Sequence, residues 1–121
     1  MRMADCIFCK IIKGEIPSQK VYEDDKVYAF HDINPVAPTH ILIVPKKHLA
    51  GVYELEEGDR ELMGHIFYVA RKIAEDLGFS PAQDPTRGYR LVVNSGSQAG
   101  QTVFHLHVHL LGGREMTWPP G

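Results

Sequence analysis

The sequence has few cysteines, no long hydrophobic run and no excess of positive charge among its 121 residues. The two cysteines, Cys6 and Cys9, are too few for a disulfide scaffold, and a bond between them would close a small loop that stabilises little. The longest purely aliphatic run covers residues 41–44, whereas a membrane-spanning helix needs about 18 apolar residues. Thirteen Lys and Arg against 15 Asp and Glu give a net charge of −2, which argues against a protein whose main task is binding nucleic acid or an acidic membrane.

We expect a single cytosolic domain. Residues 1–9 lack the apolar core of a secretion signal, and in the cytosol paired thiols are more often metal ligands or redox groups than disulfides. No repeat, low-complexity tract or long linker divides the chain, and its length fits one domain. The predicted domain covers residues 1–121, with an irregular tail rich in Gly and Pro over residues 112–121.

Two segments have the apolar spacing of an amphipathic helix. The first extends to about residue 13, with Asp5 as its expected N-terminal cap and Gly14 after its end. The second covers residues 60–77, and Asp59 is its expected cap. The apolar stripe of this longer helix comprises Leu62, Met63, Ile66, Phe67, Ala70, Ile73, Ala74 and Leu77.

Five shorter segments are typical of β-strands. They cover residues 20–23, 26–31, 40–45, 89–94 and 103–111. The first two flank Asp24-Asp25 and predict a hairpin, and the third is so apolar that we expect both of its faces to be covered. Together with the helices, these segments predict an α+β domain in which one long and one short helix pack on an antiparallel sheet of about five strands.

Histidine is abundant, and three histidines occur within five residues. The seven are His31, His40, His48, His65, His105, His107 and His109. In a strand the last three alternate with Leu106 and Val108, so they project from one face at intervals of about 6.6 Å. Since a zinc–nitrogen bond is about 2 Å long, one ion can readily take at most two of the three. The third must have another task.

A polar loop with two glycines, residues 95–102, precedes these histidines. Backbone N–H groups near glycine can surround an anion, and Gln and Thr side chains add donors. Taken alone, the loop is equally typical of a plain hairpin tip. Next to a row of histidines it becomes a candidate phosphate site, because a neutral imidazole is a good nucleophile toward phosphorus near pH 7.

The Cys6-x-x-Cys9 pair is a candidate metal site. A closed tetrahedral zinc site needs two more ligands, and His48 and His105 are the candidates. The alternative is a pair of reduced, buried thiols with His105 merely hydrogen-bonded.

The segment His105-Leu106-His107-Val108-His109-Leu110-Leu111 resembles the signature of the histidine-triad (HIT) family, whose members transfer or hydrolyse nucleotidyl groups. The likeness covers nearly the whole chain, implies the HIT-like fold, and is strongest to the Hint branch. The other matching segments are Phe30-His31-Asp32-Ile33, Ala37-Pro38-Thr39-His40, Val44-Pro45-Lys46-Lys47-His48, Gly100-Gln101-Thr102, and Gly112-Gly113-Arg114 with Trp118-Pro119-Pro120-Gly121 in the tail.

The resemblance implies a phosphoramidase. His107 would attack the α-phosphorus of an adenylated or guanylated amine, and water would then release AMP or GMP from the covalent nucleotidyl-histidine. His109, Gln101 and Thr102 would hold the phosphate oxygens, where fixed donors help most as charge develops. His40 would orient the triad from behind, and no metal would take part in the reaction.

The resemblance also implies a nucleotide site, a metal site and a homodimer. Asp32 would accept from the ribose hydroxyls. The remaining nucleotide contacts would come from Phe8, Ile16, Phe30, His31 and Ile33 around the base and from Asn94 and Gly100 at the phosphate. Several family members with both cysteines bind structural zinc through the residues equivalent to Cys6, Cys9, His48 and His105. Thr102 stands where the family often has Ser, and Thr117 where some relatives have a further His.

Two other functions compete with this interpretation. A histidine-triad hydrolase of dinucleoside polyphosphates or related nucleotidyl esters would use the same nucleophile. An interaction module that binds zinc and a nucleotide would have no significant catalysis.

Overall fold

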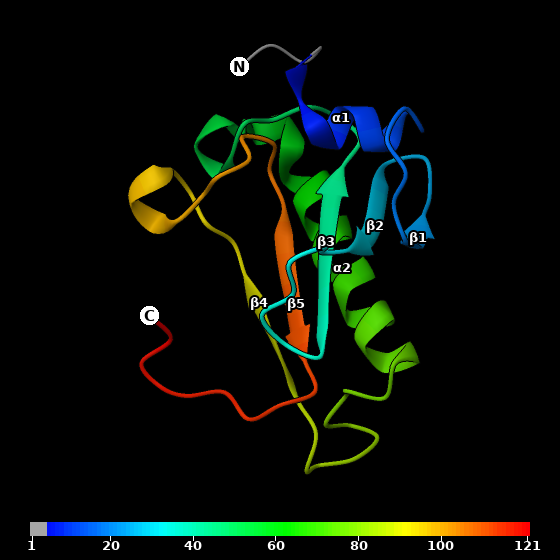
Figure 1. Cartoon of the computed structure of the whole chain (residues 1–121), viewed down its shortest axis with the longest axis vertical. Coiled ribbons are helices and arrows are strands. Elements are labelled where there is room, and N and C mark those ends of the chain that lie inside the picture. The colour runs from blue at the N-terminus through cyan, green and yellow to red at the C-terminus, as the bar shows by residue number, and fades with distance from the viewer. Residues whose placement is uncertain (1–4) are drawn as a thin grey trace.

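Five antiparallel strands form one open sheet in the order β1-β2-β3-β5-β4 (Figure 1). The structure is a computed structural model and describes residues 5–121. The strands are β1 (Lys20–Glu23), β2 (Val27–His31), β3 (Thr39–Pro45), β4 (Tyr89–Val92) and β5 (Val108–Gly112). The helices are α1 (Ile7–Ile12) and α2 (Arg60–Asp76), with 3₁₀ turns η2 (Val52–Glu54), η3 (Glu57–Asp59) and η4 (Ser97–Ala99). The predicted α+β fold is confirmed.

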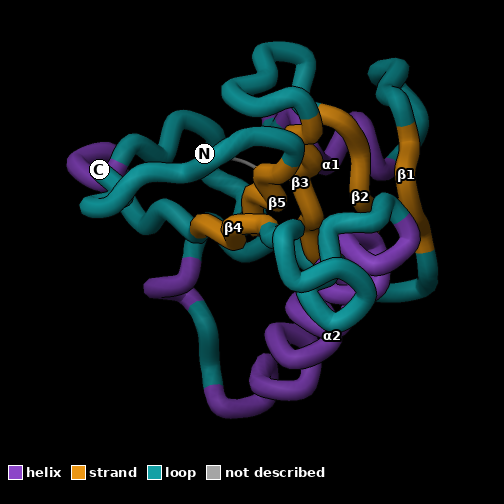
Figure 2. Tube along the Cα trace, turned by 90° about the horizontal axis from the view of Figure 1, so that it is seen from below, coloured by secondary structure: helices purple, strands orange, loops and turns teal. Residues whose placement is uncertain are grey.

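The two faces of the sheet pack against different helices (Figures 1 and 2). On one face α2 buries Ile66, Val69, Ala70, Ile73 and Ala74 against Val27, Ala29, Ile41, Ile43, Leu106, Val108 and Leu110. On the other face α1 buries Phe8 and Ile11 with Tyr28, Phe30, Leu42 and Val44. The central strand β3 is thus covered on both faces, as its apolar sequence predicts.

Both helices differ in detail from the prediction. The cap of α1 is Cys6, whose Sγ accepts from the Cys9 N–H at 3.4 Å, and not Asp5. Asp59 does precede α2, but its carboxylate contacts Lys47 and the Glu56 N–H and makes no capping bond to α2. The buried stripe of α2 is narrower than predicted, because Phe67 and Leu77 are exposed. No helix among residues 5–121 is long and apolar enough to span a membrane.

The expected strand over residues 103–111 begins only at Val108. The segment 103–107 leaves the ladder, and its Leu106 N–H donates to the Leu49 carbonyl at 2.7 Å. The partner strand β4 likewise ends at Val92 rather than residue 94. The sheet therefore opens at the end where His105 and His107 lie.

Asp24 ties the β1–β2 turn to α2. Its Oδ1 accepts from the backbone N–H groups of Lys26 and Val27, both at 2.8 Å. Its Oδ2 accepts from Tyr22 at 2.8 Å and lies 2.6 Å from Nε2 of His65, a residue with no role in the sequence-based prediction. Burial raises the pKa of Asp24, but these hydrogen bonds outweigh burial and hold the pKa well below its usual range.

We expect Asp24→Asn to lower the free energy of unfolding by about 1–3 kcal/mol, because an amide replaces one accepting oxygen and leaves its donors unpaired. Urea denaturation at pH 7 measures this loss. The matched control is Asp25→Asn in the same turn, where the side chain is exposed. Equal stability of the two variants would contradict the assignment of Asp24 as the tie.

Candidate active site and metal cluster

A cavity of about 420 Å³ lies on the sheet face opposite α2, between α1, the loop after β2 and β5. Its lining combines apolar side chains with histidines. The predicted site residues that line it are Phe8, Ile16, Phe30, His31, Asp32, Ile33, His40, Thr102, His107 and His109. The structure therefore brings most of the predicted catalytic and nucleotide-binding residues to one cavity.

His107 is held by the backbone of its own segment. Its Nδ1 lies 2.7 Å from the carbonyl oxygen of His105. A carbonyl oxygen only accepts, so Nδ1 carries the proton and Nε2 keeps a free lone pair. Burial lowers the pKa of His107, against the opposing effect of this hydrogen bond. The ring is therefore neutral at pH 7, with a nucleophilic nitrogen at the cavity.

His40 and His109 form a hydrogen-bonded chain behind His107. The Val36 N–H donates to His40 Nδ1 at 3.1 Å, so the proton of neutral His40 is on Nε2. This Nε2–H donates to His109 Nδ1 at 2.9 Å and lies 3.4 Å from the Asp32 carboxylate. The proton of neutral His109 is then on its own Nε2.

The Nε2 of His109 is buried and has no hydrogen-bond partner among residues 5–121. A buried donor without an acceptor is costly and unusual in a folded protein. The ring borders the cavity 4.8 Å from that of His107, centroid to centroid, so this N–H is an unsatisfied donor close to the cavity.

Asp32, His40 and His109 also lie close enough together to be considered as metal ligands. The hydrogen bond from Val36 argues against this, because it leaves the facing nitrogen of His40 as an N–H donor rather than a lone pair. We interpret these residues as a hydrogen-bonded chain.

Only part of the loop predicted to bind phosphate faces the cavity. The Gln101 side chain is buried and fully used: its Nε2 donates to the carbonyls of Ala50 and Val103, and its Oε1 accepts from Gly96. Gln101 therefore holds the loop in shape instead of presenting its amide to a ligand. Thr102 lines the cavity, whereas Asn94 and Gly100 are not among the lining residues.

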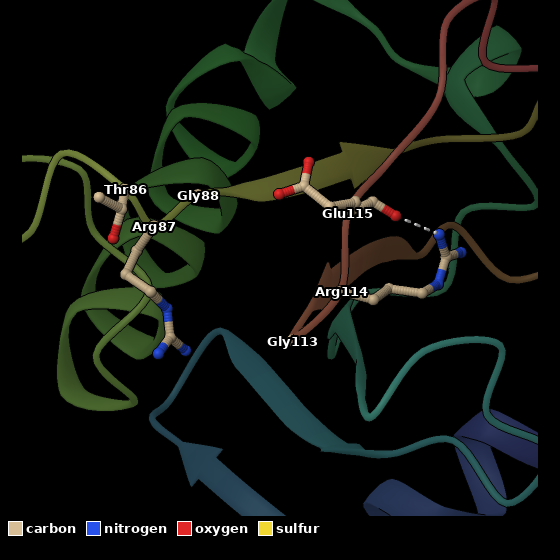
Figure 3. Close-up of a pocket in the computed structure, with 6 residues that line it drawn as sticks. All are labelled: Thr86, Arg87, Gly88, Gly113, Arg114 and Glu115. Carbon is tan, nitrogen blue, oxygen red and sulfur yellow. Dashed lines mark hydrogen bonds between the residues drawn. The ribbon is translucent and has the colours of Figure 1, made fainter.

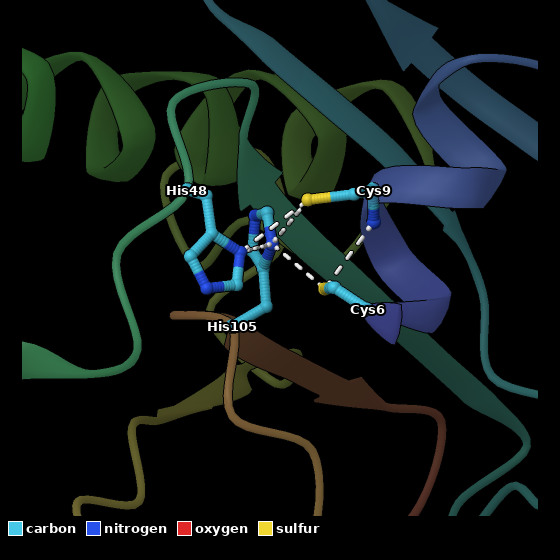
Figure 4. A group of neighbouring side chains, drawn as sticks. All are labelled: Cys6, Cys9, His48 and His105. Atoms are coloured by element: carbon cyan, nitrogen blue, oxygen red, sulfur yellow. Dashed lines mark hydrogen bonds between the residues drawn. The ribbon is translucent and has the colours of Figure 1, made fainter. Parts of the chain in front are cut away.

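The four predicted metal ligands lie close together at the N-terminal end of α1 (Figure 4). Cys6 Sγ lies 3.3 Å from His105 Nδ1, and Cys9 Sγ lies 3.3 Å from His48 Nδ1 and 3.6 Å from His105 Nδ1. The two Nδ1 atoms are 3.1 Å apart. His105 is fully buried, and its Nε2–H donates to the Pro45 carbonyl at 2.8 Å, so its Nδ1 has a free lone pair.

These distances fit one tetrahedral metal ion. With metal–sulfur bonds of about 2.3 Å and metal–nitrogen bonds of about 2.0 Å, tetrahedral donors lie about 3.3–3.8 Å apart. The sulfur–nitrogen distances of 3.3–3.6 Å fall in this range, and the two nitrogens, 3.1 Å apart, lie slightly closer. Burial, together with the hydrogen bond and charge of Cys6, raises the pKa of Cys9 to about 11. A thiolate at this position therefore needs a cation beside it, and the cluster can hold a metal ion.

A separate surface groove of about 290 Å³ lies along the tail, and the sequence did not point to it (Figure 3). Its Arg114 donates from Nε to the Val36 carbonyl at 3.2 Å and from Nη1 to the Glu115 carbonyl at 3.0 Å. Arg87 lies over the Phe79 ring. Arg114 in the tail thus bonds to the carbonyl of Val36, and the N–H of Val36 donates to His40. These two hydrogen bonds connect the tail to the candidate active site.

Several residues that shape the candidate site were not predicted from the sequence, because they act through backbone groups. Val36 N–H and the carbonyls of Pro45 and His105 each determine which nitrogen of a histidine is protonated. No side-chain pattern shows such partners. Ile7 and Ile11 also line the cavity, and their proximity to Phe8 in the sequence is the only signal that could have indicated them.

The chain shows its family by sequence and by structure. Residues 13–116 match the HIT domain. A "14 kDa zinc-binding protein" from Zea mays is 55% identical over 117 residues, which cover 95% of this chain and 87% of that protein. A HIT family hydrolase from Legionella pneumophila Philadelphia 1 superposes with a TM-score of 0.89 at 51% identity, covering 97% of this chain and 100% of that chain. A histidine triad protein from Clostridium difficile gives 0.87 at 51% identity, with 97% of each chain covered.

The chain therefore belongs to the HIT domain family. Its fold and its three alternating histidines are those of the histidine-triad proteins that it resembles.

Burial lowers the pKa of His109 to about 4, and the neighbouring rings of His107 and His40 add to this effect. Between pH 6.5 and 4 an unfolded chain thus binds a proton here that the folded chain does not. Folding stability therefore falls as the pH falls through this window, by up to about 1.4 kcal/mol per pH unit for one group.

We expect His109→Gln to show a shallower loss of stability than the wild type between pH 6.5 and 4, because it removes this titrating group. Urea denaturation at a series of pH values measures the difference. His31→Gln, which removes an exposed histidine, is the control and should retain the wild-type dependence. Parallel profiles for wild type and His109→Gln would refute the assignment.

Proposed function

We propose that this protein hydrolyses purine nucleoside 5′-phosphoramidates through a covalent nucleotidyl-histidine. The observation that carries the proposal is the pair of nitrogens at the cavity: the lone pair on His107 Nε2 and the unpartnered N–H on His109 Nε2. A nucleophile beside a free donor suits attack on a phosphorus atom whose oxygens gain charge. The solved relative from Legionella pneumophila, named a HIT family hydrolase, supports a hydrolytic reaction.

The shape of the cavity supports a nucleotide as substrate. Phe8, Phe30 and Ile16 give the cavity an apolar wall, which suits a purine ring. Asp32 lines the same cavity with its carboxylate 3.4 Å from His40 Nε2, and a carboxylate can accept from two neighbouring ribose hydroxyls. The α-phosphate then reaches His107.

The reaction proceeds in two displacements at phosphorus. The His107 Nε2 lone pair forms a bond to the α-phosphorus, the bond from phosphorus to the amine breaks, and the amine leaves with that electron pair and a proton from water. His109 Nε2–H donates to a phosphate oxygen, and His40 holds the His109 ring. Water then attacks phosphorus and loses a proton to the hydroxide left by the first displacement. The bond to Nε2 breaks, its electron pair returns to Nε2, and AMP or GMP leaves.

His107→Ala should lower turnover of an adenosine phosphoramidate by roughly 10³-fold or more, because it removes the nucleophile. Mass spectrometry of wild-type protein quenched with a slow substrate should show one nucleotidyl group on His107. His109→Gln is the matched variant, which reacts more slowly but still forms the adduct. Unchanged turnover in His107→Ala, or an adduct on another residue, would refute the proposal.

The same assay separates the competing functions. A strong preference for a diadenosine polyphosphate would instead indicate a histidine-triad hydrolase of dinucleoside polyphosphates. Nucleotide binding without turnover of either substrate would make it an interaction module.

We also propose that the cluster of Cys6, Cys9, His48 and His105 binds one structural Zn²⁺. Two sulfur and two nitrogen donors at tetrahedral spacing favour zinc over harder cations. The relative from Zea mays is named a zinc-binding protein, which supports the choice of metal.

Cys6→Ser with Cys9→Ser should abolish zinc binding, measured as metal content per chain after purification without added metal. The wild type should lose stability on chelation, by about 2.7 kcal/mol relative to free zinc at about 100 times its Kd. His31→Asn, outside the cluster, should keep one zinc. A wild type that binds no zinc, even when it is supplied, would leave the thiols as core residues.

A further inference from the structure

His105 belongs to both sites. Its ring presents Nδ1 to Cys6, Cys9 and His48. Its backbone carbonyl accepts from Nδ1 of His107 at 2.7 Å, and this bond exposes the nucleophilic lone pair. A change in the position of this one residue would therefore reach the nucleophile directly.

The α1 helix makes a second connection. Cys6 and Cys9 flank Phe8, whose ring meets His107 edge to face at 5.2 Å between centroids and His105 at 6.0 Å. Phe8 is also part of the cavity wall. The position of α1 thus determines both the wall of the cavity and the packing of the His107 ring.

Apolar packing also holds these segments, since α1 buries Phe8 and Ile11 against the sheet and Leu106 lies in the core. A helix of six residues is too short to be stable alone, and residues 103–107 have left the sheet ladder. The Leu106 N–H bonds the carbonyl of Leu49, the residue after His48. The four ligands therefore add a further connection among three segments, which are the start of α1, the loop after β3, and the segment before β5. The last two are also joined through the Gln101 side chain.

We propose that the metal cluster positions the nucleophile. When its four ligands close on one ion, the His105 carbonyl and the Phe8 ring hold His107 with its proton on Nδ1. Without the ion the sheet and α2 remain folded, but the orientation and tautomer of His107 are released. His105 is a positioning residue in this scheme, and its effect on turnover rests on the proposed function.

The test compares His48→Ala with His48→Cys. His48 is half-buried and lies outside the catalytic cavity, so its loss removes one ligand without touching the nucleophile. His48→Cys restores a fourth donor and is the matched control. Because three ligands can retain zinc, wild-type protein stripped with a chelator and then reloaded with Zn²⁺ is the second comparison.

Three quantities are measured for each sample: zinc content, native structure by far-ultraviolet circular dichroism, and the protonated nitrogen of His107 by long-range ¹H–¹⁵N NMR without substrate. We expect zinc-free protein to remain folded, to show mixed tautomers at His107, and to lose about 10- to 100-fold in kcat. Reloading the wild type, or the His48→Cys variant with zinc bound, should restore the Nδ1–H form and kcat.

Zinc-free protein that keeps a single Nδ1–H tautomer and full kcat would overturn the inference. Unfolding of both zinc-free samples would also overturn it, because the cluster would then stabilise the whole domain. If the tautomer follows zinc while the wild type turns over no phosphoramidate, the positioning stands and the proposed function fails.

Discussion

The hydrogen bond from His107 Nδ1 to the His105 carbonyl is the interaction on which the site depends. It leaves a lone pair on the nitrogen that borders the cavity, and it requires a carbonyl that can turn toward a side chain. In a regular strand, backbone carbonyls lie in the plane of the sheet and bond to the neighbouring strand. The departure of residues 103–107 from the ladder is therefore what allows this bond to form. The irregular backbone just before β5 thus leaves His107 with a free lone pair on Nε2, which a continuous strand would not have done.

The two faces of the sheet differ in their role: one packs against α2 and forms the main core, and the other carries the histidines and the cavity. On the α2 face β3 and β5 contribute fully buried aliphatic side chains such as Ile41 and Leu110. On the opposite face the register pairs Leu42 with His109 and His40 with Leu111, so the two histidines become diagonal neighbours and their rings meet. Because α2 supplies most of the packing, the other face can accommodate polar groups and a cavity. The buried donor on His109 is tolerated within an otherwise well-packed domain.

Sequence reasoning succeeded where side-chain periodicity decides the structure. The helix over residues 60–77, the hairpin around Asp24 and the doubly covered strand over residues 40–45 follow from apolar spacing, and each forms within a residue or so of the prediction. Alternation failed at residues 103–107, because Leu106 stays in the core while its backbone bonds to Leu49, outside the ladder. For a related reason, no pattern in the sequence indicates that the loop itself uses the side-chain amide of Gln101. The resemblance supplied the roles of the histidines, whereas their tautomers required the structure.

The two neighbouring sites remain chemically distinct because a backbone carbonyl already takes one N–H of His105 and another takes one N–H of His107. Pro45 takes the Nε2–H of His105 and directs Nδ1 to the cysteines. His105 in turn takes the Nδ1–H of His107, so the free lone pair of that ring is on Nε2, at the cavity and not in the metal cluster. Three alternating histidines therefore do not compete for one ion. The backbone assigns the first to the cluster and the second to the cavity, and the third, His109, is assigned by the ring of His40.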